Sequence, residues 1–205
     1  MRNLLDQYSR LHEFIQERIN KDIYPEHPSQ LHTEITEKMI ERLDSHQPLA
    51  GKKILDCGCG QGVALEMFRN KGAKVIGTTF GEDHKICRQK GFEVYEMDQS
   101  FLDFIPNSFD IVWCRHALEH SLMPLFTLRG FSEVLKPGGI LYLEMPAPDT
   151  AAMHETNQNH YSCFTKRAWI SLIERSDFSI FDNTDIKFTV SVGEDQYYSF
   201  FCRKN

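Results

Sequence analysis

The stretch that decides the fold is ILDCGCGQG, residues 54–62. It begins as a short apolar run of the kind that forms a buried strand. Glycines follow at 58, 60 and 62, just before a helix-length segment. Because glycine reaches backbone conformations closed to other residues, this spacing predicts a tight strand-to-helix turn that approaches a ligand. A glycine turn that binds nothing is the alternative.

The glycine spacing also discriminates between ligands. A dinucleotide turn follows G-x-G-x-x-G, but here Val63 stands where the third glycine of that pattern would fall. An acidic residue, Asp56, ends the strand instead. A carboxylate at that point attracts an ammonium group and repels a pyrophosphate. An NAD-dependent dehydrogenase is therefore the weaker alternative.

The chain beyond this turn alternates short apolar runs with helix-length segments. Expected strands cover residues 53–57, 74–79, 93–98, 109–114 and 140–145, and expected helices cover 61–71, 82–90, 122–135 and 165–176. Such alternation predicts an α/β fold, a mostly parallel sheet with helices on both faces. The tail, 178–192 and 197–202 around Gly193-Glu194-Asp195, has the pattern of a hairpin.

Two amphipathic segments precede this region. Residues 3–19 and 29–45 carry apolar side chains at helical spacing and are separated by a proline-containing break at 24–29. We therefore divide the chain into an N-terminal helical extension or lid, 1–48, and one α/β domain, 49–205. The apolar faces of both helices are expected to be packing faces.

Composition narrows the class of protein. The chain has 205 residues, 41% hydrophobic and 25% charged, which is typical of a globular domain. The net charge of −6 argues against a nucleic-acid binder. Neither a signal peptide nor a membrane span is recognisable, and the six scattered cysteines suit reduced thiols. We expect a cytoplasmic protein that binds neither nucleic acid nor a membrane. The sequence gives no basis for predicting its oligomeric state.

Five segments in order resemble the class I S-adenosylmethionine-dependent methyltransferases, and they cover residues 52–146. They are Asp56-x-Gly58-x-Gly60-x-Gly62, Asp98-Gln99-Ser100-Phe101-Leu102, Asn107-Ser108-Phe109-Asp110-Ile111-Val112, His116-Ala117-Leu118-Glu119-His120 and Val134-Leu135-Lys136-Pro137-Gly138-Gly139-Ile140-Leu141. The resemblance implies a Rossmann-like sheet of seven strands, mostly parallel with an antiparallel last strand. It also implies S-adenosyl-L-methionine as cofactor and S-adenosyl-L-homocysteine as product.

The resemblance assigns cofactor contacts residue by residue. Gly58 and Gly60 would meet the methionine part, with Gln61 beside them, and Asp56 would lie near its amino group. Asp98 would accept a hydrogen bond from the adenine amino group. Flanking contacts would come from Gln99 and Ser100 at the adenine ring and from Cys114 and Arg115 at the methionine moiety.

The end of the second strand departs from the family. Members usually carry an acid there that grips both ribose hydroxyls, whereas this chain has Thr79, followed by Phe80, which could still pack against adenine. A hydroxyl makes a weaker bond than a carboxylate. Either Thr79 accepts the weaker grip, or Glu82 or Asp83 reaches back from the next helical turn.

Histidine is the natural base for the proton that a methylated group must lose. His116, just past the fourth strand, and His160, in the long loop after the fifth, are the candidate catalytic residues, whereas His120 is expected to be structural. The loop residues 149–161 could also form a divalent-ion site, but we predict no metal.

The sequence therefore predicts methyl transfer from S-adenosylmethionine to oxygen, nitrogen or carbon of a small-molecule or glycan-like acceptor. The Asn-Pro-Pro-Tyr and Pro-Cys segments of nucleic-acid base methylation are absent from the chain. The alternative, motivated by Thr79, is a catalytically weak module that binds S-adenosylmethionine or S-adenosylhomocysteine, or a subunit of a larger assembly.

Overall fold

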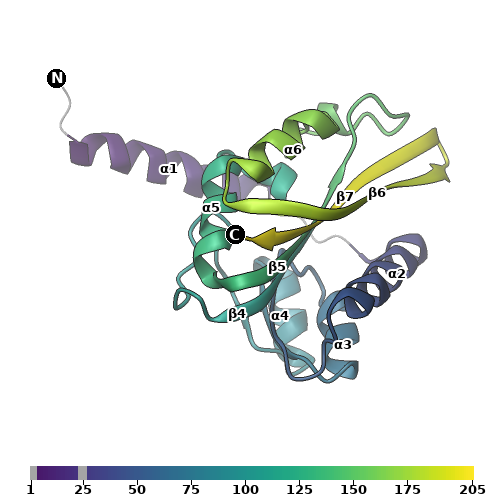
Figure 1. The fold of residues 1–205 in the computed structure, drawn as a ribbon. Helices are drawn as coiled ribbons and strands as arrows, with labels where there is room; N and C mark the ends of the chain where they lie inside the picture. The colour runs from purple at the N-terminus through teal and green to yellow at the C-terminus, as the bar shows by residue number, and fades with distance from the viewer. Residues whose placement is uncertain (1–3, 23–26) are drawn as a thin grey trace.

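The computed structural model describes residues 4–22 and 27–205, and its centre is a seven-stranded sheet (Figure 1). The strands lie in the order β3-β2-β1-β4-β5-β7-β6. Their bounds are Lys53–Cys57 (β1), Lys74–Thr78 (β2), Val94–Tyr95 (β3), Phe109–Arg115 (β4), Leu135–Pro146 (β5), Phe178–Val190 (β6) and Gly193–Lys204 (β7). Strands β1 to β5 pair in parallel, and β7 runs antiparallel to both of its neighbours. The predicted fold class is confirmed.

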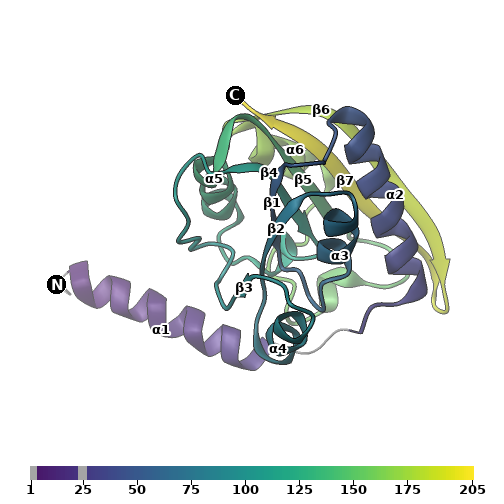
Figure 2. The same ribbon diagram turned by 90° about the horizontal axis from the view of Figure 1, so that it is seen from below.

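Helices cover both faces of the sheet, as Figures 1 and 2 show. The helices are α1 (Leu4–Asp22), α2 (Gln30–His46), α3 (Val63–Asn70), α4 (Gly81–Gln89), α5 (Pro124–Val134) and α6 (Lys166–Glu174), with the 3₁₀ turns η1 (Leu118–His120) and η2 (His154–Thr156). Helices α5 and α6 contribute Phe131 and Trp169 to one core, and α2 and α3 contribute Leu43 and Phe68 to the other.

The first helix differs from its prediction. Ile15 is buried, but Leu5, Tyr8, Leu11 and Phe14 are exposed. Figure 2 shows that α1 projects away from the sheet, with its first turns apart from the other described helices and strands. The expectation of a fully packed apolar face is therefore wrong for α1. The predicted break at 24–29 lies partly outside the described residues.

The second helix behaves as part of the α/β domain. Its Ile40 and Leu43 are buried in one core with Ile54 of β1. Ser29 caps the helix, and its hydroxyl accepts a hydrogen bond from the backbone N–H of His32. The boundary at 48/49 stays a prediction, although packing continues across it.

Three strand boundaries differ from the sequence prediction. The strand expected at 93–98 is only Val94–Tyr95, because the chain then turns at Asp98, whose carboxylate accepts the backbone N–H of Ser100. Strand β5 begins at Leu135 and not at Ile140, since Leu135 already pairs with Phe109 before a register shift. The hairpin turns at 191–192, and Gly193 is the first residue of β7. None of the helices within residues 4–22 and 27–205 combines the length and the apolar composition that a membrane span requires.

Candidate functional site

The glycine turn lies where β1 ends, beside the ends of β2 and β4. Gly58, Gly60 and Gly62 all have positive φ, at 77°, 49° and 84°. The backbone N–H groups of Gly58 and Cys59 donate to the carbonyl of Thr78, at 3.0 and 2.9 Å, and this fixes the turn against β2. A Cβ at position 58 would stand 2.5 Å from Cβ of Ala117, so this position has no room for a side chain.

Two adjoining cavities open at this edge of the sheet, with volumes of about 250 and 340 Å³. Gly58, Gly60, His116 and His120 line both cavities and mark the junction between them. The carboxyl ends of parallel strands are where open α/β sheets bind ligands. Most of the residues singled out in the sequence therefore come together in one place.

The first cavity receives Thr79, Phe80, Asp98, Gln99 and Ser100. Ser100 itself is buried, and its hydroxyl lies 2.7 Å from that of Thr127, so the side chain is used within the fold. The side-chain amide of Gln99 donates to the carbonyl of Ala117 at 2.6 Å. These bonds position the segment after β3 along the cavity wall.

A carboxylate lies at the same cavity as Thr79, the residue that stands where the family usually carries an acid. Asp83, in the first turn of α4, is buried and lines the first cavity together with Thr79. Glu82 instead points to solvent and pairs with Lys85 at 3.0 Å. Of the alternatives left open by the sequence, Asp83 is the carboxylate at the cavity.

The second cavity receives Asp56, Gln61, Arg115 and His160. Asp56 is buried at the end of β1, and its Oδ2 atom has no hydrogen-bond partner among the described residues. Burial raises the pKa of Asp56 to about 7, although the positive charge of Arg115 opposes the shift. The cavity thus presents a buried carboxyl group that a cationic ligand would ionise.

Cys114 does not line either cavity. It is fully buried in the core beside Leu118 and Leu128, and its thiol lies 3.9 Å from Oε1 of Gln99. Successive side chains of a strand point to opposite faces, so Arg115 reaches the cavity while its predecessor cannot. The expected contact of Cys114 with a ligand has no support in this geometry.

A buried carboxylate on β5 organises the wall between the cavities. Glu144 is fully buried, and its Oε1 atom lies 2.7 Å from Nε of Arg115 and 2.9 Å from Nε2 of His116. The hydroxyl of Tyr142 donates to Oε2 at 2.5 Å. Burial alone would raise the pKa of Glu144, but Arg115 and His116 hold it below its usual value. The carboxylate is therefore ionised and held by its partners.

His116 is held by carboxylates at both ring nitrogens. Nε2 faces Glu144, and Nδ1 lies 3.6 Å from Oε1 of Glu119, itself buried. Burial and Arg115 lower the pKa of His116, but the facing carboxylates of Glu119 and Glu144 outweigh them and raise it. Nε2 is within hydrogen-bond distance of Glu144, and Nδ1 faces the second carboxylate at a longer distance. A ring held between two carboxylates favours a positioning role over a base.

The second cavity also gathers histidines from distant parts of the chain. They are His27, His32, His116, His120, His154 and His160. His32 on α2 lies 2.9 Å from the hydroxyl of Tyr197, and His154 lies 3.0 Å from both carboxylate oxygens of the buried Asp195. Burial lowers the pKa of His160, so its ring is neutral near pH 7 and can accept a proton.

Sequence reasoning missed several residues of this site. Glu144, Glu119 and Tyr197 were not singled out, although an acid inside the apolar run ILYLEMP is a recognisable signal of a buried charge. Tyr197 carries no such local signal, since only the sheet order brings β7 beside α2 and β5.

A family profile described as a methyltransferase domain matches residues 29–180. The ubiquinone biosynthesis O-methyltransferases of Stutzerimonas stutzeri and Pseudomonas aeruginosa are 32% identical over 117 residues and 31% identical over 112 residues. These matches cover 53% and 51% of this chain and 50% and 48% of the relatives, so the chain spans about half the length of the curated relatives it matches.

Solved structures share the fold. A SAM-dependent methyltransferase from Archaeoglobus fulgidus superposes with a TM-score of 0.67 at 20% identity, covering 84% of this chain and 94% of that one. The [4+2]-cyclase SpnF superposes with a TM-score of 0.68, also at 20% identity, covering 82% and 80%. The expected fold is thereby confirmed, and the family profile bears out the resemblance read from the sequence.

Proposed function

Because this chain belongs to the family of methyltransferase domains, we propose that it transfers a methyl group from S-adenosylmethionine to an oxygen atom of a small hydroxylated acceptor. The names of the matched relatives, O-methyltransferases that share about half their length with this chain, support oxygen over nitrogen or carbon. A phenolic hydroxyl is the acceptor class that fits those names best.

The observation that carries the proposal is the junction of the two cavities at the glycine turn. In this proposal an adenosyl group would occupy the first cavity, where Phe80 and Asp98 are lining residues that would supply an aromatic ring and a hydrogen-bond acceptor. The methionine part would cross Gly58 and Gly60 into the second cavity. There Asp56 would meet its ammonium group and Arg115 its carboxylate.

Asp83 is our candidate for the ribose contact. Its carboxylate lines the first cavity one helical turn beyond Thr79, where the family usually carries the acid. A carboxylate can accept a charge-assisted hydrogen bond from each of the two ribose hydroxyls, whereas a threonine hydroxyl accepts fewer and weaker hydrogen bonds. The departure at position 79 is then compensated within the same cavity.

The acceptor would enter the second cavity from the side of the histidines. Methyl transfer is an in-line displacement, so the acceptor oxygen must lie opposite the sulfur, and it must lose its proton. His160 is the candidate at which that proton leaves, because its ring is neutral, while His116 would orient groups at the junction. The six free thiols support a reducing, cytosol-like environment for the protein. The net charge of −6 supports an acceptor that is not a nucleic acid.

Calorimetric titration with S-adenosylmethionine, S-adenosylhomocysteine and NAD tests the cofactor. We expect micromolar binding of both adenosyl ligands and none of NAD. Release of S-adenosylhomocysteine would then be measured with a panel of phenols and vicinal diols, with amines of matched size for contrast. Binding weaker than about 1 mM, roughly −4 kcal/mol, would contradict the proposal and favour a module that needs a partner.

The variant His160→Ala tests the acceptor side. Turnover should fall at least about tenfold while affinity for S-adenosylhomocysteine stays unchanged, as expected for loss of a proton-transfer group. His12, an exposed residue of α1, supplies the control variant His12→Ala. Unchanged turnover in His160→Ala would remove this residue from the reaction.

A further inference from the structure

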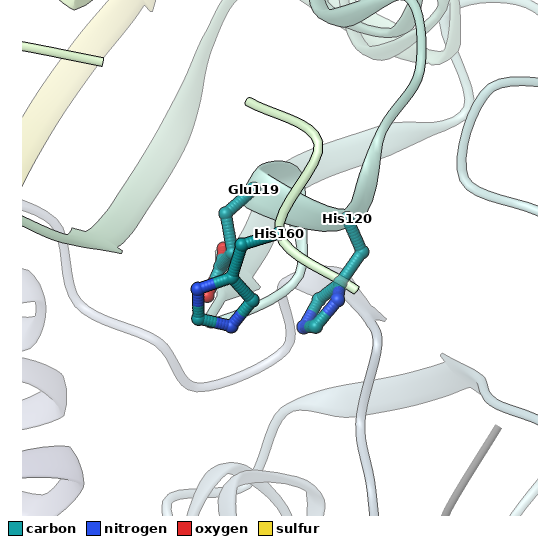
Figure 3. A group of neighbouring side chains, drawn as sticks. All are labelled: Glu119, His120 and His160. Atoms are coloured by element: carbon teal, nitrogen blue, oxygen red, sulfur yellow. The ribbon is translucent and has the colours of Figure 1, made fainter. Parts of the chain in front are cut away.

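Three side chains of the second cavity converge on one point (Figure 3). Glu119 and His120 come from η1, and His160 comes from the loop after β5. Each offers one ligand atom, and these atoms all lie within 4.8 Å of one another. The loop is tied to η1 because the backbone N–H of Ser162 donates to the carbonyl of Glu119 at 2.9 Å. The cluster is therefore built by two segments held together by the fold.

Glu119 is the strongest indication that the cluster binds a cation. The residue is 1% exposed, and its Oε1 faces His116, but its Oε2 atom is buried without a hydrogen-bond partner among the described residues. An unpaired oxygen of a buried carboxylate costs free energy unless a positive group meets it.

The two histidines are arranged as metal ligands usually are. Nδ1 of His120 lies 2.9 Å from the carbonyl oxygen of Asn159, so Nδ1 carries the proton and Nε2 keeps its lone pair. A backbone carbonyl behind the far nitrogen is the common partner of a ligating imidazole. Nδ1 of His160 is buried and has no partner in the described chain. Nε2 of His160 lies 3.3 Å from the Asn157 amide nitrogen. If Nδ1 binds the cation, Nε2 carries the proton and this contact would rearrange.

The donor set selects a class of cation. Two imidazoles and one carboxylate suit zinc and the neighbouring divalent transition ions, whereas magnesium and calcium prefer oxygen donors. Three protein ligands leave a coordination position open, as in catalytic zinc sites. All three residues line the second cavity, so that position faces the space proposed for the acceptor.

We propose that Glu119, His120 and His160 hold a zinc-class divalent cation whose open position binds the acceptor oxygen. The inference rests on the proposed function and extends it, because it replaces a free base by a Lewis acid. The acceptor hydroxyl, once bound, gives its proton to water in the open cavity. Its oxygen then bonds to the methyl carbon as the carbon–sulfur bond breaks and its electron pair stays on sulfur. The products are the methyl ether, S-adenosylhomocysteine and one proton, so atoms and charge balance.

Cation binding can be measured without any acceptor. Zinc would be titrated into the metal-free protein in competition with a chromophoric chelator, and cobalt(II) would report the ligands by its visible spectrum. We expect one cation per chain and a spectrum of nitrogen and oxygen ligands without a thiolate charge-transfer band. His120→Ala and His160→Ala should each weaken binding at least about 100-fold, since loss of a mere supporting residue already costs 10- to 100-fold. His12→Ala should bind as the wild type does.

The outcomes separate this inference from the proposed function. Absence of stoichiometric binding, a thiolate band, or full binding in both alanine variants would overturn the cation site. Glu119→Gln keeps the shape of the side chain and should also lose the cation, which covers the case in which an alanine variant fails to fold. Titration of the same samples with S-adenosylhomocysteine provides the second readout. If the protein binds S-adenosylhomocysteine but fails to bind zinc, only the cation site is overturned. If it binds zinc but fails to bind S-adenosylhomocysteine, the cation site stands and the proposed cofactor site is contradicted.

Discussion

The buried carboxyl group of Asp56 gives the most direct test of the cofactor site. Replacing it by asparagine keeps its size and removes its charge. The pKa of Asp56 rises from 3.8 to about 7 because the residue is buried. The difference between these two pKa values, about 3, corresponds to about 4 kcal/mol, because each factor of ten in an equilibrium constant is roughly 1.4 kcal/mol. This is the free energy by which the folded, ligand-free protein disfavours the ionised form.

The sign of the pH dependence follows from which state holds the proton. Between the unfolded and folded pKa values the folded chain keeps the proton of Asp56 and the unfolded chain has lost it. Stability therefore falls as pH rises through this window, and it levels off above about 7. From about pH 5 to about pH 8, the wild type should lose about 3 kcal/mol of unfolding free energy relative to Asp56→Asn. Arg115 on β4 is the charged group that opposes the shift, and the neighbouring thiol of Cys57 stays neutral because burial raises its pKa to about 12.

Ligand binding should reverse this preference, because an ammonium group beside Asp56 stabilises the ionised form. Near pH 6 about nine-tenths of the free protein carries the proton, so binding of S-adenosylhomocysteine should release about 0.9 proton per site. Affinity should fall about tenfold from about pH 7.5 to about pH 6. Calorimetry in two buffers with different ionisation enthalpies measures the released proton, and urea unfolding measures the stability.

Asp103→Asn, at an exposed carboxylate, is the control and should change neither result. Binding without proton release, together with parallel pH profiles for the wild type and Asp56→Asn, would refute the reasoning. It would mean that Asp56 is already ionised in the free protein or does not meet the ammonium group.

Three further predictions follow from the packing of the site. Gly58→Ala should lower the unfolding free energy measured in urea by about 2–4 kcal/mol, because position 58 has a positive φ and a Cβ there would clash at 2.5 Å. Gly91→Ala is the control, with a positive φ but open space, and should cost only about 1 kcal/mol. Equal losses would rule out the clash. Asp83→Asn should weaken S-adenosylhomocysteine binding about tenfold or more in calorimetry. Glu82→Gln, at the solvent-exposed neighbour, should leave this affinity unchanged. Equal effects of the two variants would exclude Asp83 as the ribose ligand. Glu144→Gln should lower the unfolding free energy by about 3–5 kcal/mol, because the partly buried Arg115 and His116 lose their buried anion. A loss below about 1 kcal/mol would mean that this network is not ionised.

Local patterns predicted the part of the site that is local in sequence. The glycine turn, the strand before it and Asp56 lie within ten residues, and the structure places them together as expected. The thiol of Cys114 lies in the core and not at either cavity, because adjacent residues of β4 face opposite sides of the sheet. The ligand contact assigned to this residue stays a prediction.

The site residues that sequence patterns did not predict depend on how the strands pair, and no local stretch of sequence encodes that pairing. Glu144 meets Arg115 because β5 and β4 pair in a register that places the two residues opposite each other. A shift of one residue would turn that carboxylate to the other face. Likewise, Asp83 lines the first cavity because α4 begins directly beyond β2, which places the first turn of the helix there.

The distribution of unsatisfied polar atoms joins these observations. Buried polar groups in folded proteins are almost always paired, and each exception calls for a reason. Here Oδ2 of Asp56, Nη2 of Arg115, Oε2 of Glu119 and Nδ1 of His160 are all buried and unpartnered among the described residues, and all four residues line the second cavity. Each such atom costs folding free energy that the surrounding cores must offset. An ammonium group, a carboxylate and a divalent cation would satisfy them in turn, so the same atoms that weaken the ligand-free fold specify what it binds.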